Sequence, residues 1–240
     1  MKVMSTKWLV SLSLLLVVFL SVPLSAQDLS IGTDIVSRYI WRGFDLGQNT
    51  PSIQPTIEFS TGGFTAGFWG AWATANDVTN EIDIYASYAF DLSTAGGLSL
   101  GVTDYTNPND GTKIGNFNNY DNANGPGAHF LEGNINYSGP GSFPISLSFN
   151  FFFYNVANNP IYFEAGYGAT VKDVGVDFFV GGTPGEKGYY YAVNNFSIIN
   201  TGIKVSKEIK ITDSFSLPVF GSVILNPATE NMYYVLGISL

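Results

Sequence analysis

The sequence predicts an all-β fold, a transmembrane antiparallel up-and-down β-barrel, and three observations support this. The chain ends on apolar residues at every second position, Met232, Tyr234, Leu236, Ile238 and Leu240, so its last strand has one continuous apolar face. The chain contains 19 Phe and 14 Tyr, while only 12% of its residues are charged. No segment after residue 26 reaches the ~20 consecutive apolar residues of a spanning helix, so we expect strands to meet the lipid.

Residues 1–26 are predicted to be a secretory signal peptide that is removed. Lys2 and Lys7 precede and flank the start of an apolar run from Trp8 to Leu20, and Ala26 stands just before the polar residues that follow. This run is too short to span a bilayer as a helix, and small residues at its end suit signal peptidase. We therefore expect residues 27–240 to form a single barrel in the bacterial outer membrane.

The length and the alternating pattern predict twelve strands. A membrane strand needs about 9–11 residues, so residues 27–240 fit a barrel of ten to fourteen strands. Ten or fourteen strands remain the alternatives, because a strand pair near residues 171–196 could be merged or split. The expected strands are 29–42, 51–60, 63–74, 80–91, 96–106, 127–138, 144–155, 160–171, 174–181, 196–208, 214–225 and 231–240.

Three of these strands alternate sharply, and the alternation assigns their two faces. The apolar positions would face lipid and the intervening positions the lumen. The predicted lipid-facing positions include Ile53, Ile57 and Phe59 in the second strand, Ile82, Ile84, Tyr88 and Phe90 in the fourth, and Ile145, Leu147, Phe149, Phe151 and Phe153 in the seventh.

The expected connections also sort by length, as they do in barrels with both chain ends in the periplasm. The odd-numbered connections include residues 43–50, 75–79, 107–126 and 182–195, whereas the even-numbered ones include 61–62, 92–95 and 172–173. Long outer loops and short inner turns give this pattern, and a soluble β-sandwich has no reason to produce it.

Charge and composition exclude several function classes. The net charge is −9. Loss of Lys2 and Lys7 with the signal leaves 8 basic against 19 acidic residues, a net charge of −11. We therefore expect no nucleic-acid partner. The absence of cysteine excludes disulfides, thiolate nucleophiles and lipoprotein attachment at an N-terminal cysteine.

Charged residues at inward positions are the candidate lumen and selectivity residues. Arg38 and Arg42 share a face of the first predicted strand, while Glu58, Glu81 and Asp83 are inward on the second and fourth. Such a cluster is either a structural plug or a transverse field that orients a passing solute. The further inward candidates are Glu132, Glu164, Asp177 and Lys204. Acids outnumber bases, which favours cations or neutral polar solutes over anions.

The long connection at 107–126 is rich in Asn, Asp and Gly. It could be a solvated outer loop, a constriction folded into the lumen, or a calcium site. The spacing of its acids does not match an EF-hand loop, so the solvated loop is favoured and no metal site is expected.

The aromatic residues have two expected roles. Interface belts and lipid-facing bulk, rather than sugar stacking, are expected of the aromatics on the last two strands and of Tyr39, Trp41, Trp69, Trp72, Tyr88 and Tyr137. The tyrosine run at 189–191 would lie in an outer loop or on the rim, where a belt is favoured over contact with a ligand. Others are inward in the predicted register, and they would close the bore if they stacked at one level. These inward aromatics are Tyr85, Phe152, Tyr154, Phe179 and Phe220.

No enzymatic constellation is visible in the sequence. The one histidine, His129, lies at the start of the sixth predicted strand, and no serine near it has a local catalytic signature. An outer-membrane lipase would need such a serine beside the histidine. We therefore expect a protein that is not an enzyme and that uses no cofactor.

Several blocks resemble one known family. Ile35 to Gly43, Thr50 to Gln54, Gly63 to Gly70 and Glu81 to Tyr85 are similar in order and spacing to the opening of the TorF family of porins, also labelled Gcw_chp. The strong match covers residues 35–90. This resemblance implies an outer-membrane barrel of Gram-negative bacteria with a role in transport, and it names no solute. The chain departs from the pattern in its Asn-rich insertion after Asn107 and in its final Leu240, where outer-membrane strands usually end in Phe.

Two functions of different class follow. The first is a porin or channel for small polar solutes or ions. The second is a closed structural or surface-interaction barrel whose outer loops bind a partner without transport. In both cases the expected partners are outer-membrane lipids and the barrel-assembly machinery, which would recognise the C-terminal strand.

Overall fold

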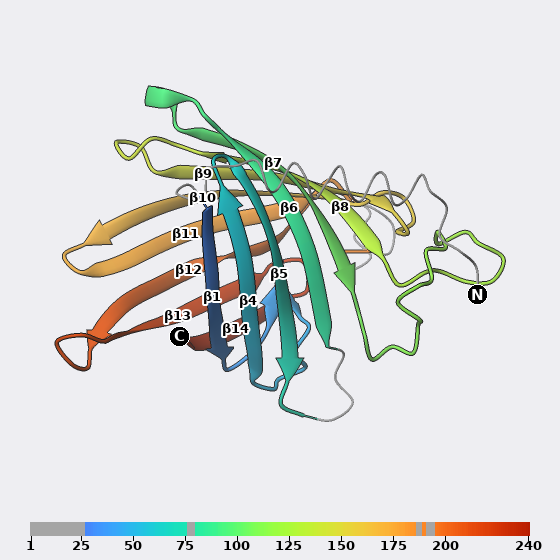
Figure 1. The fold of residues 1–240 in the computed structure, drawn as a ribbon, viewed down its shortest axis with the longest axis horizontal. Coiled ribbons are helices and arrows are strands. Elements are labelled where there is room, and N and C mark those ends of the chain that lie inside the picture. The colour runs from blue at the N-terminus through green and yellow to red at the C-terminus, as the bar shows by residue number, and fades with distance from the viewer. Residues whose placement is uncertain (1–26, 76–79, 186–188, 191–194) are drawn as a thin grey trace.

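The computed structural model describes residues 27–75, 80–185, 189–190 and 195–240, so the predicted signal peptide lies outside the described residues. Twelve antiparallel strands form a closed barrel in which each strand pairs with the next and the last returns to the first (Figure 1). This confirms the predicted fold class and strand number. The barrel strands are β1 (Gln27–Val36), β4 (Ser52–Thr61), β5 (Phe64–Ala73), β6 (Glu81–Asp91), β7 (Gly97–Thr106), β8 (Phe130–Ser138), β9 (Ile145–Tyr154), β10 (Ile161–Val171), β11 (Val174–Thr183), β12 (Ser197–Lys210), β13 (Ser216–Asn226) and β14 (Asn231–Ser239).

The two ends of the barrel differ in their connections. Residues 37–51, 107–129 and 184–196 join strands at one end, which we name the long-loop end. Residues 62–63, 92–96 and 172–173 join strands at the other, the short-turn end, where a 3-10 turn spans Ser93–Ala95. These connections sort by length as predicted, whereas 227–230, at the long-loop end, is shorter than 139–144 and 211–215 at the short-turn end. Within the described residues, no helix has the length and apolar character needed to cross a membrane.

The outer wall of the barrel is apolar, as the alternation predicts. Ile53 and Ile57 on β4, Ile84 on β6 and Leu147 on β9 are all exposed, and so is Leu236 on β14, at 69%. Large apolar side chains exposed around a closed barrel are what a membrane barrel presents to lipid. The intervening residues on the same strands face the lumen.

The first strand differs from its predicted range of 29–42. β1 ends at Val36, and the chain then turns into a short hairpin of β2 (Ile40–Trp41) and β3 (Phe44–Asp45). Arg42 and Gly43 occupy the turn with φ of 49° and 80°, the positive pair that a tight two-residue hairpin requires. Arg38 and Arg42 therefore lie beyond the strand rather than on one of its faces.

The sixth predicted strand also begins later than expected. β8 starts at Phe130, so residues 127–129 belong to the connection. A register shift between Leu131 and Glu132 pairs Tyr154 with Leu131 and Phe152 with Glu132. Because one residue of β9 is extra at this bulge, Tyr154 no longer follows the inward alternation of Phe152.

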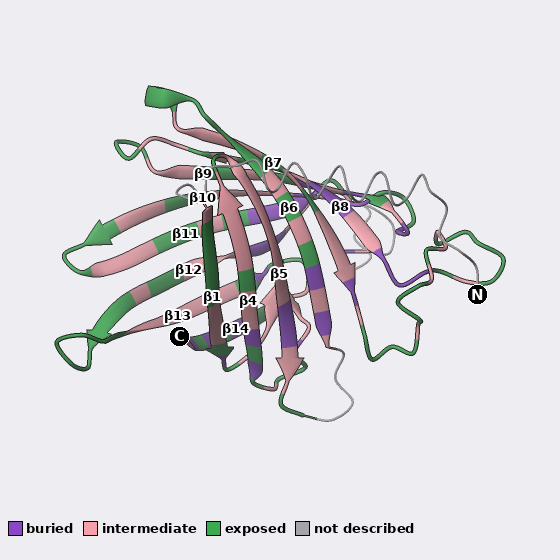
Figure 2. Ribbon diagram, in the orientation of Figure 1, coloured by how far each residue is buried: buried purple, intermediate pink, exposed green. Residues whose placement is uncertain are grey.

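The core lies inside the barrel near the long-loop end. Buried positions gather on the strand segments that adjoin this end, while the segments near the short turns are mainly intermediate or exposed (Figure 2). A cluster of Tyr162, Tyr190 and Ile199 is fully or almost fully buried, and Trp41, Phe44 and Tyr189 pack against it. The lumen is thus filled by side chains at one end only.

Candidate functional site

The connection between β1 and β4 folds into the lumen, and we name residues 37–51 the inward hairpin. Its Tyr39 ring lies 5.3 Å from Trp69 on β5, and the Tyr39 hydroxyl is 3.4 Å from a carboxylate oxygen of Glu81 on β6. On another side, the side-chain amide of Asn226 on β13 donates to the Gly43 carbonyl at 3.2 Å. The hairpin therefore contacts strands on well-separated parts of the wall.

Gly43 allows the hairpin to approach the wall this closely. A Cβ atom at this position would lie 2.0 Å from the carbonyl oxygen of Ile199 on β12. Only glycine fits there without a shift of the backbone, and only glycine adopts its positive φ without strain. The hairpin tip is thus seated against β12 and β13.

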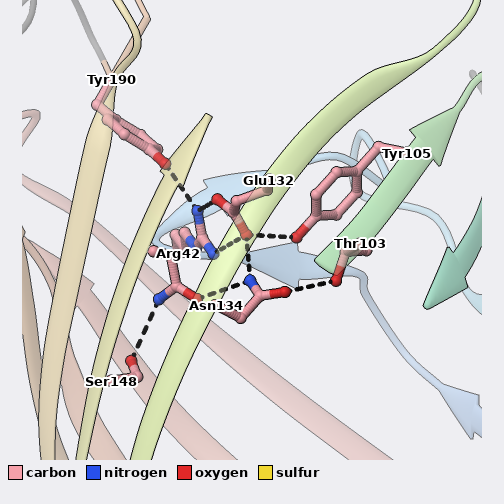
Figure 3. Close-up of polar contacts among 8 residues, drawn as sticks. Arg42, Thr103, Tyr105, Glu132, Asn134, Ser148 and Tyr190 are labelled. Atoms are coloured by element: carbon pink, nitrogen blue, oxygen red, sulfur yellow. Dashed lines mark hydrogen bonds and ion pairs between the residues drawn. The ribbon is translucent and has the colours of Figure 1, made fainter. Parts of the chain in front are cut away.

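Arg42 forms the strongest polar contact of the hairpin. Its two terminal nitrogens donate to the two carboxylate oxygens of Glu132 on β8, at 2.5 Å and 2.8 Å. The same guanidinium donates to the Tyr190 hydroxyl at 2.7 Å (Figure 3). This two-point pairing of an arginine with a carboxylate fixes both the distance and the orientation of the hairpin.

Polar side chains of the wall surround this ion pair and complete its hydrogen bonds. Tyr105 on β7 donates its hydroxyl to Glu132 at 2.9 Å, and the side-chain amide of Asn134 donates to the same carboxylate at 2.9 Å. Thr103 donates in turn to the Asn134 carbonyl oxygen at 2.9 Å (Figure 3). Glu132, which is fully buried, is therefore well satisfied in a place where an unpaired carboxylate would be costly.

The groups of this site that lie outside the strands remain in one protonation state near neutral pH. Burial opposes the charge of Arg42, but Tyr190 and Glu132 outweigh it and hold the guanidinium pKa well above its ordinary value. Burial raises the pKa of Tyr190 to about 12. The Tyr190 hydroxyl is thus neutral and accepts its hydrogen bond from a charged arginine.

Aromatic rings from the hairpin, the wall and the connection between β11 and β12 pack around the ion pair. Trp41 lies 6.0 Å from Tyr105 and 6.1 Å from Tyr190, and the Arg42 guanidinium is 4.4 Å from the Trp41 ring centre. Phe152 lies 5.6 Å from Tyr105 and 5.1 Å from Tyr189. Tyr39, Trp41 and Trp69 are thus lumen residues, and their expected place in a lipid-interface belt was wrong.

A cavity of about 420 Å³ lies between the inward hairpin and the wall, and we name it the outer cavity. Its lining is aromatic and acidic: Trp41, Asp45, Leu46, Gln48, Glu81, Tyr105, Asn107, Phe130, Phe152 and Tyr189. Glu81 is 9% exposed, and Asp83, two residues further along the same face of β6, is 8% exposed.

The remaining candidates lie apart from the hairpin, towards the short-turn end. Asp177 on β11 is paired in register with Lys204 on β12, and both line cavities of about 550 and 390 Å³. Glu164 lines the second of these and accepts from Asn200 at 2.9 Å. Glu58 accepts from the Tyr85 hydroxyl at 2.9 Å. These groups form a polar vestibule below the hairpin.

The ion pairs in the structure therefore differ from the charge cluster predicted from the sequence. Arg42 pairs with Glu132, not with Glu58, Glu81 or Asp83, and Arg38 pairs with Asp45 of its own hairpin at 3.6 Å. Sequence reasoning gave Tyr105 no role in the site. It assigned Trp41 to a lipid-interface belt and placed Tyr190 in an outer loop or on the rim. The available signal in the sequence was Gly43 after Arg42, because a glycine at the end of a short alternating stretch indicates a tight turn.

The long connection 107–129 is held at the rim by its own contacts. His129 bonds Asp104 on β7 at 2.7 Å and the Ile114 carbonyl at 2.8 Å, and Phe117 stacks on the imidazole at 4.0 Å. Both imidazole nitrogens are therefore occupied, with no serine among their partners. Among residues 27–75, 80–185, 189–190 and 195–240, no group of three or more His, Asp or Glu side chains could hold a metal ion.

Twelve strands closed around a polar lumen, with one connection folded inside, define a porin-like β-barrel. A solved KdgM porin has a similar fold, with a TM-score of 0.54 and 13% sequence identity over 87% of this chain and 96% of that one. A family model described as "Bacterial protein of unknown function (Gcw_chp)" matches residues 21–181. The chain belongs to this family, which confirms the resemblance drawn from residues 35–90. No curated protein matches the chain.

Proposed function

We propose that this protein is an outer-membrane porin-type channel for small polar solutes or ions, with the inward hairpin as its constriction. The observation that carries the proposal is the two-point bond of Arg42 to Glu132, because it fixes a connection from β1 against β8. In the barrel order β8 lies five strands from β1 on one side and seven on the other, so the hairpin reaches almost straight across.

The long-loop end faces the outside of the cell in this proposal. Barrels with this connectivity keep short turns in the periplasm and long loops outside. The apolar outer wall would meet outer-membrane lipid, and the assembly machinery would recognise the alternating β14 and its final Leu240. A solute would then meet the outer cavity first, pass the hairpin and leave through the polar vestibule.

Charge supports a preference for cations or neutral solutes over anions. Around the hairpin, Arg38 is paired with Asp45 and Arg42 with Glu132, which leaves Glu81 and Asp83 as uncompensated carboxyl groups among the described residues. Carboxylates at a constriction favour cations. In the vestibule Lys204 lies beside Asp177, while Glu58 and Glu164 are bonded to Tyr85 and Asn200. Acids therefore outnumber bases in the vestibule as well as at the hairpin.

One observation favours a second function, a closed barrel that acts through its outer loops. Glu132, Tyr190 and Ile199 have no exposed surface, so the lumen is completely filled beside β8, β10 and β12. If the filling extends across the whole section, nothing passes, and the connection 107–129 becomes the candidate for partner contact.

Single-channel recording separates the two functions. The full-length gene is expressed, the protein is purified from the membrane fraction, and current is recorded across a planar bilayer with a salt gradient. Discrete steps with a cation-selective reversal potential are expected of the channel. A folded, heat-modifiable sample without current would favour the closed barrel.

A further inference from the structure

The outer cavity combines aromatic faces with one carboxyl group, that of Glu81, that no base compensates among the described residues. Trp41, Tyr105, Phe130, Phe152 and Tyr189 supply aromatic rings, and Glu81 and Asp45 supply the acids. Asp45 is already paired with Arg38. No lysine or arginine is among the described residues that line this cavity, so its free charge is that of Glu81.

Asp83 adds a second uncompensated carboxyl group directly behind Glu81. The two side chains share the lumen face of β6. One carboxylate oxygen of Asp83, Oδ1, is buried without any hydrogen-bond partner. Two adjacent buried carboxyl groups cannot both stay ionised without a positive charge nearby, so the pair needs a proton or an external cation.

The aromatic lining decides what kind of cation fits. A metal ion prefers several oxygen ligands, and no cluster of three or more His, Asp or Glu side chains occurs in the described part of the chain. An ammonium group with apolar substituents is instead attracted both by carboxylates and by the faces of aromatic rings. A neutral sugar could stack on the same rings, but it would leave the carboxyl pair uncompensated.

We propose that the outer cavity is a binding site for a small organic cation, a substituted ammonium compound whose charge lies against Glu81, with Asp83 behind it, and whose apolar groups contact Tyr105, Phe130 and Phe152. The cavity volume of about 420 Å³ falls within the range of small-molecule sites. This deepens the proposed function by naming a ligand for the channel entrance.

Binding does not require conductance, so the two proposals can fail separately. Calorimetric titration of the purified full-length gene product in detergent uses choline as the probe. Its uncharged isostere, 3,3-dimethylbutan-1-ol, serves as the control ligand. We expect choline to bind at least ten-fold more tightly than the isostere. Equal binding of the two ligands, or no binding of choline, would overturn the cation site, whatever the bilayer recordings show.

A matched pair of variants locates the site. Glu81→Gln keeps the shape and removes the charge, and it should weaken choline binding at least ten-fold. Glu58→Gln removes another lumen acid, one that is bonded to Tyr85 and does not line the outer cavity, and it should leave binding unchanged. Equal weakening by both variants would mean that choline responds to the overall negative charge of the lumen, and it would refute a local site at Glu81.

A third variant keeps the test decisive if Glu81→Gln folds poorly. Phe130→Leu removes one aromatic face of the cavity while it preserves the charges and most of the bulk. It should weaken choline several-fold and leave the heat-modifiable folded form intact. Unchanged choline affinity in a folded Phe130→Leu variant would rule out the aromatic contact on which the choice of an organic cation depends.

Discussion

Arg42 and Glu132 are 90 residues apart in the chain, yet they meet through two short hydrogen bonds inside the barrel. One belongs to a hairpin tip and the other to the wall strand almost opposite the hairpin's origin. Because both carboxylate oxygens are used and Tyr105 and Asn134 add further donors, this pair is the main polar attachment of the hairpin. Removal of this ion pair should therefore show how the hairpin affects stability and conductance.

The first prediction concerns that attachment. Arg42→Ala leaves Glu132 buried without its counter-charge, and loss of one partner of a buried ion pair typically costs about 3–5 kcal/mol of unfolding free energy. We also expect larger and noisier single-channel currents, because the hairpin loses its hydrogen bonds to Glu132 on β8. Urea unfolding in lipid vesicles and planar bilayer recording measure the two effects.

The control for this variant replaces both partners. Arg42→Met combined with Glu132→Leu removes the charges together, and such replacements recover much of the stability of a buried pair. If the double variant is as unstable as Arg42→Ala, the contribution of Arg42 comes from its packing on Trp41 and Tyr162 and not from the ion pair.

The second prediction tests how closely the hairpin tip is seated. Gly43→Ala should displace the tip, because the new Cβ atom would lie 2.0 Å from the Ile199 carbonyl oxygen. Gly111→Ala is a matched control, since Gly111 has a φ of 88° against 80° for Gly43 but open space around it. Strain at a positive φ costs about 1 kcal/mol in both. Only Gly43→Ala should increase protease cleavage within residues 37–51, and equal cleavage in the two variants would contradict the close contact.

The outer wall could be predicted from the sequence because its physical rule is local. Alternation with period two fixes which side chains face lipid, and Ile57 and Leu236 follow it without any knowledge of their neighbours. The connection lengths separated a membrane barrel from a soluble β-sandwich. A closed barrel of consecutive hairpins has few other arrangements available, so the strand number followed as well.

The interior could not be predicted in the same way, because its contacts join residues far apart in the chain. The pattern at Ile35 to Trp41 alternates well enough to continue a strand, and nothing local shows that Val36 is its last residue. The partner of Arg42 depends on the direction in which a two-residue turn orients the Arg42 side chain. A one-residue bulge in β9 likewise changed the facing of Tyr154, which periodicity alone does not reveal.

The third prediction concerns ion selectivity in the vestibule. Lys204 lies in register with Asp177 and its ammonium group is 4.4 Å from the Phe220 ring centre. Lys204→Gln removes the positive charge and leaves Asp177 unopposed, so the reversal potential in a salt gradient should move towards greater cation preference. Lys172→Gln, at the exposed turn between β10 and β11, is the comparison. If both variants shift the potential equally, the vestibule does not contribute to selectivity.

The fourth prediction tests the anchor of the long connection. His129→Ala removes the bonds to Asp104 and to the Ile114 carbonyl, and a typical hydrogen bond contributes about 0.5–1.5 kcal/mol. Residues 107–129 should then be cleaved faster by protease on intact cells, while the barrel keeps its heat-modifiable form. Unchanged cleavage would show that two other sets of bonds hold this connection without the imidazole. The Tyr154 hydroxyl donates to the Phe117 carbonyl, and the Asn155 side-chain amide donates to the backbone carbonyls of Gly127 and His129.

The fifth prediction follows from the raised pKa of Tyr190. Its pKa is about 12 in the folded barrel against an ordinary 10.0, because burial penalises the phenolate. The contribution of the protonated Tyr190 hydroxyl to the unfolding free energy is therefore complete below pH 10. It is lost as the pH rises through 12, and the unfolding free energy falls by about 2–3 kcal/mol. The unfolding free energy, measured in steps across this window, should fall more steeply for the native chain than for Tyr190→Phe. Parallel slopes would mean that Tyr190 is not the group that titrates, and that the hairpin packs more loosely against the β11–β12 connection than its hydrogen bond to Arg42 indicates.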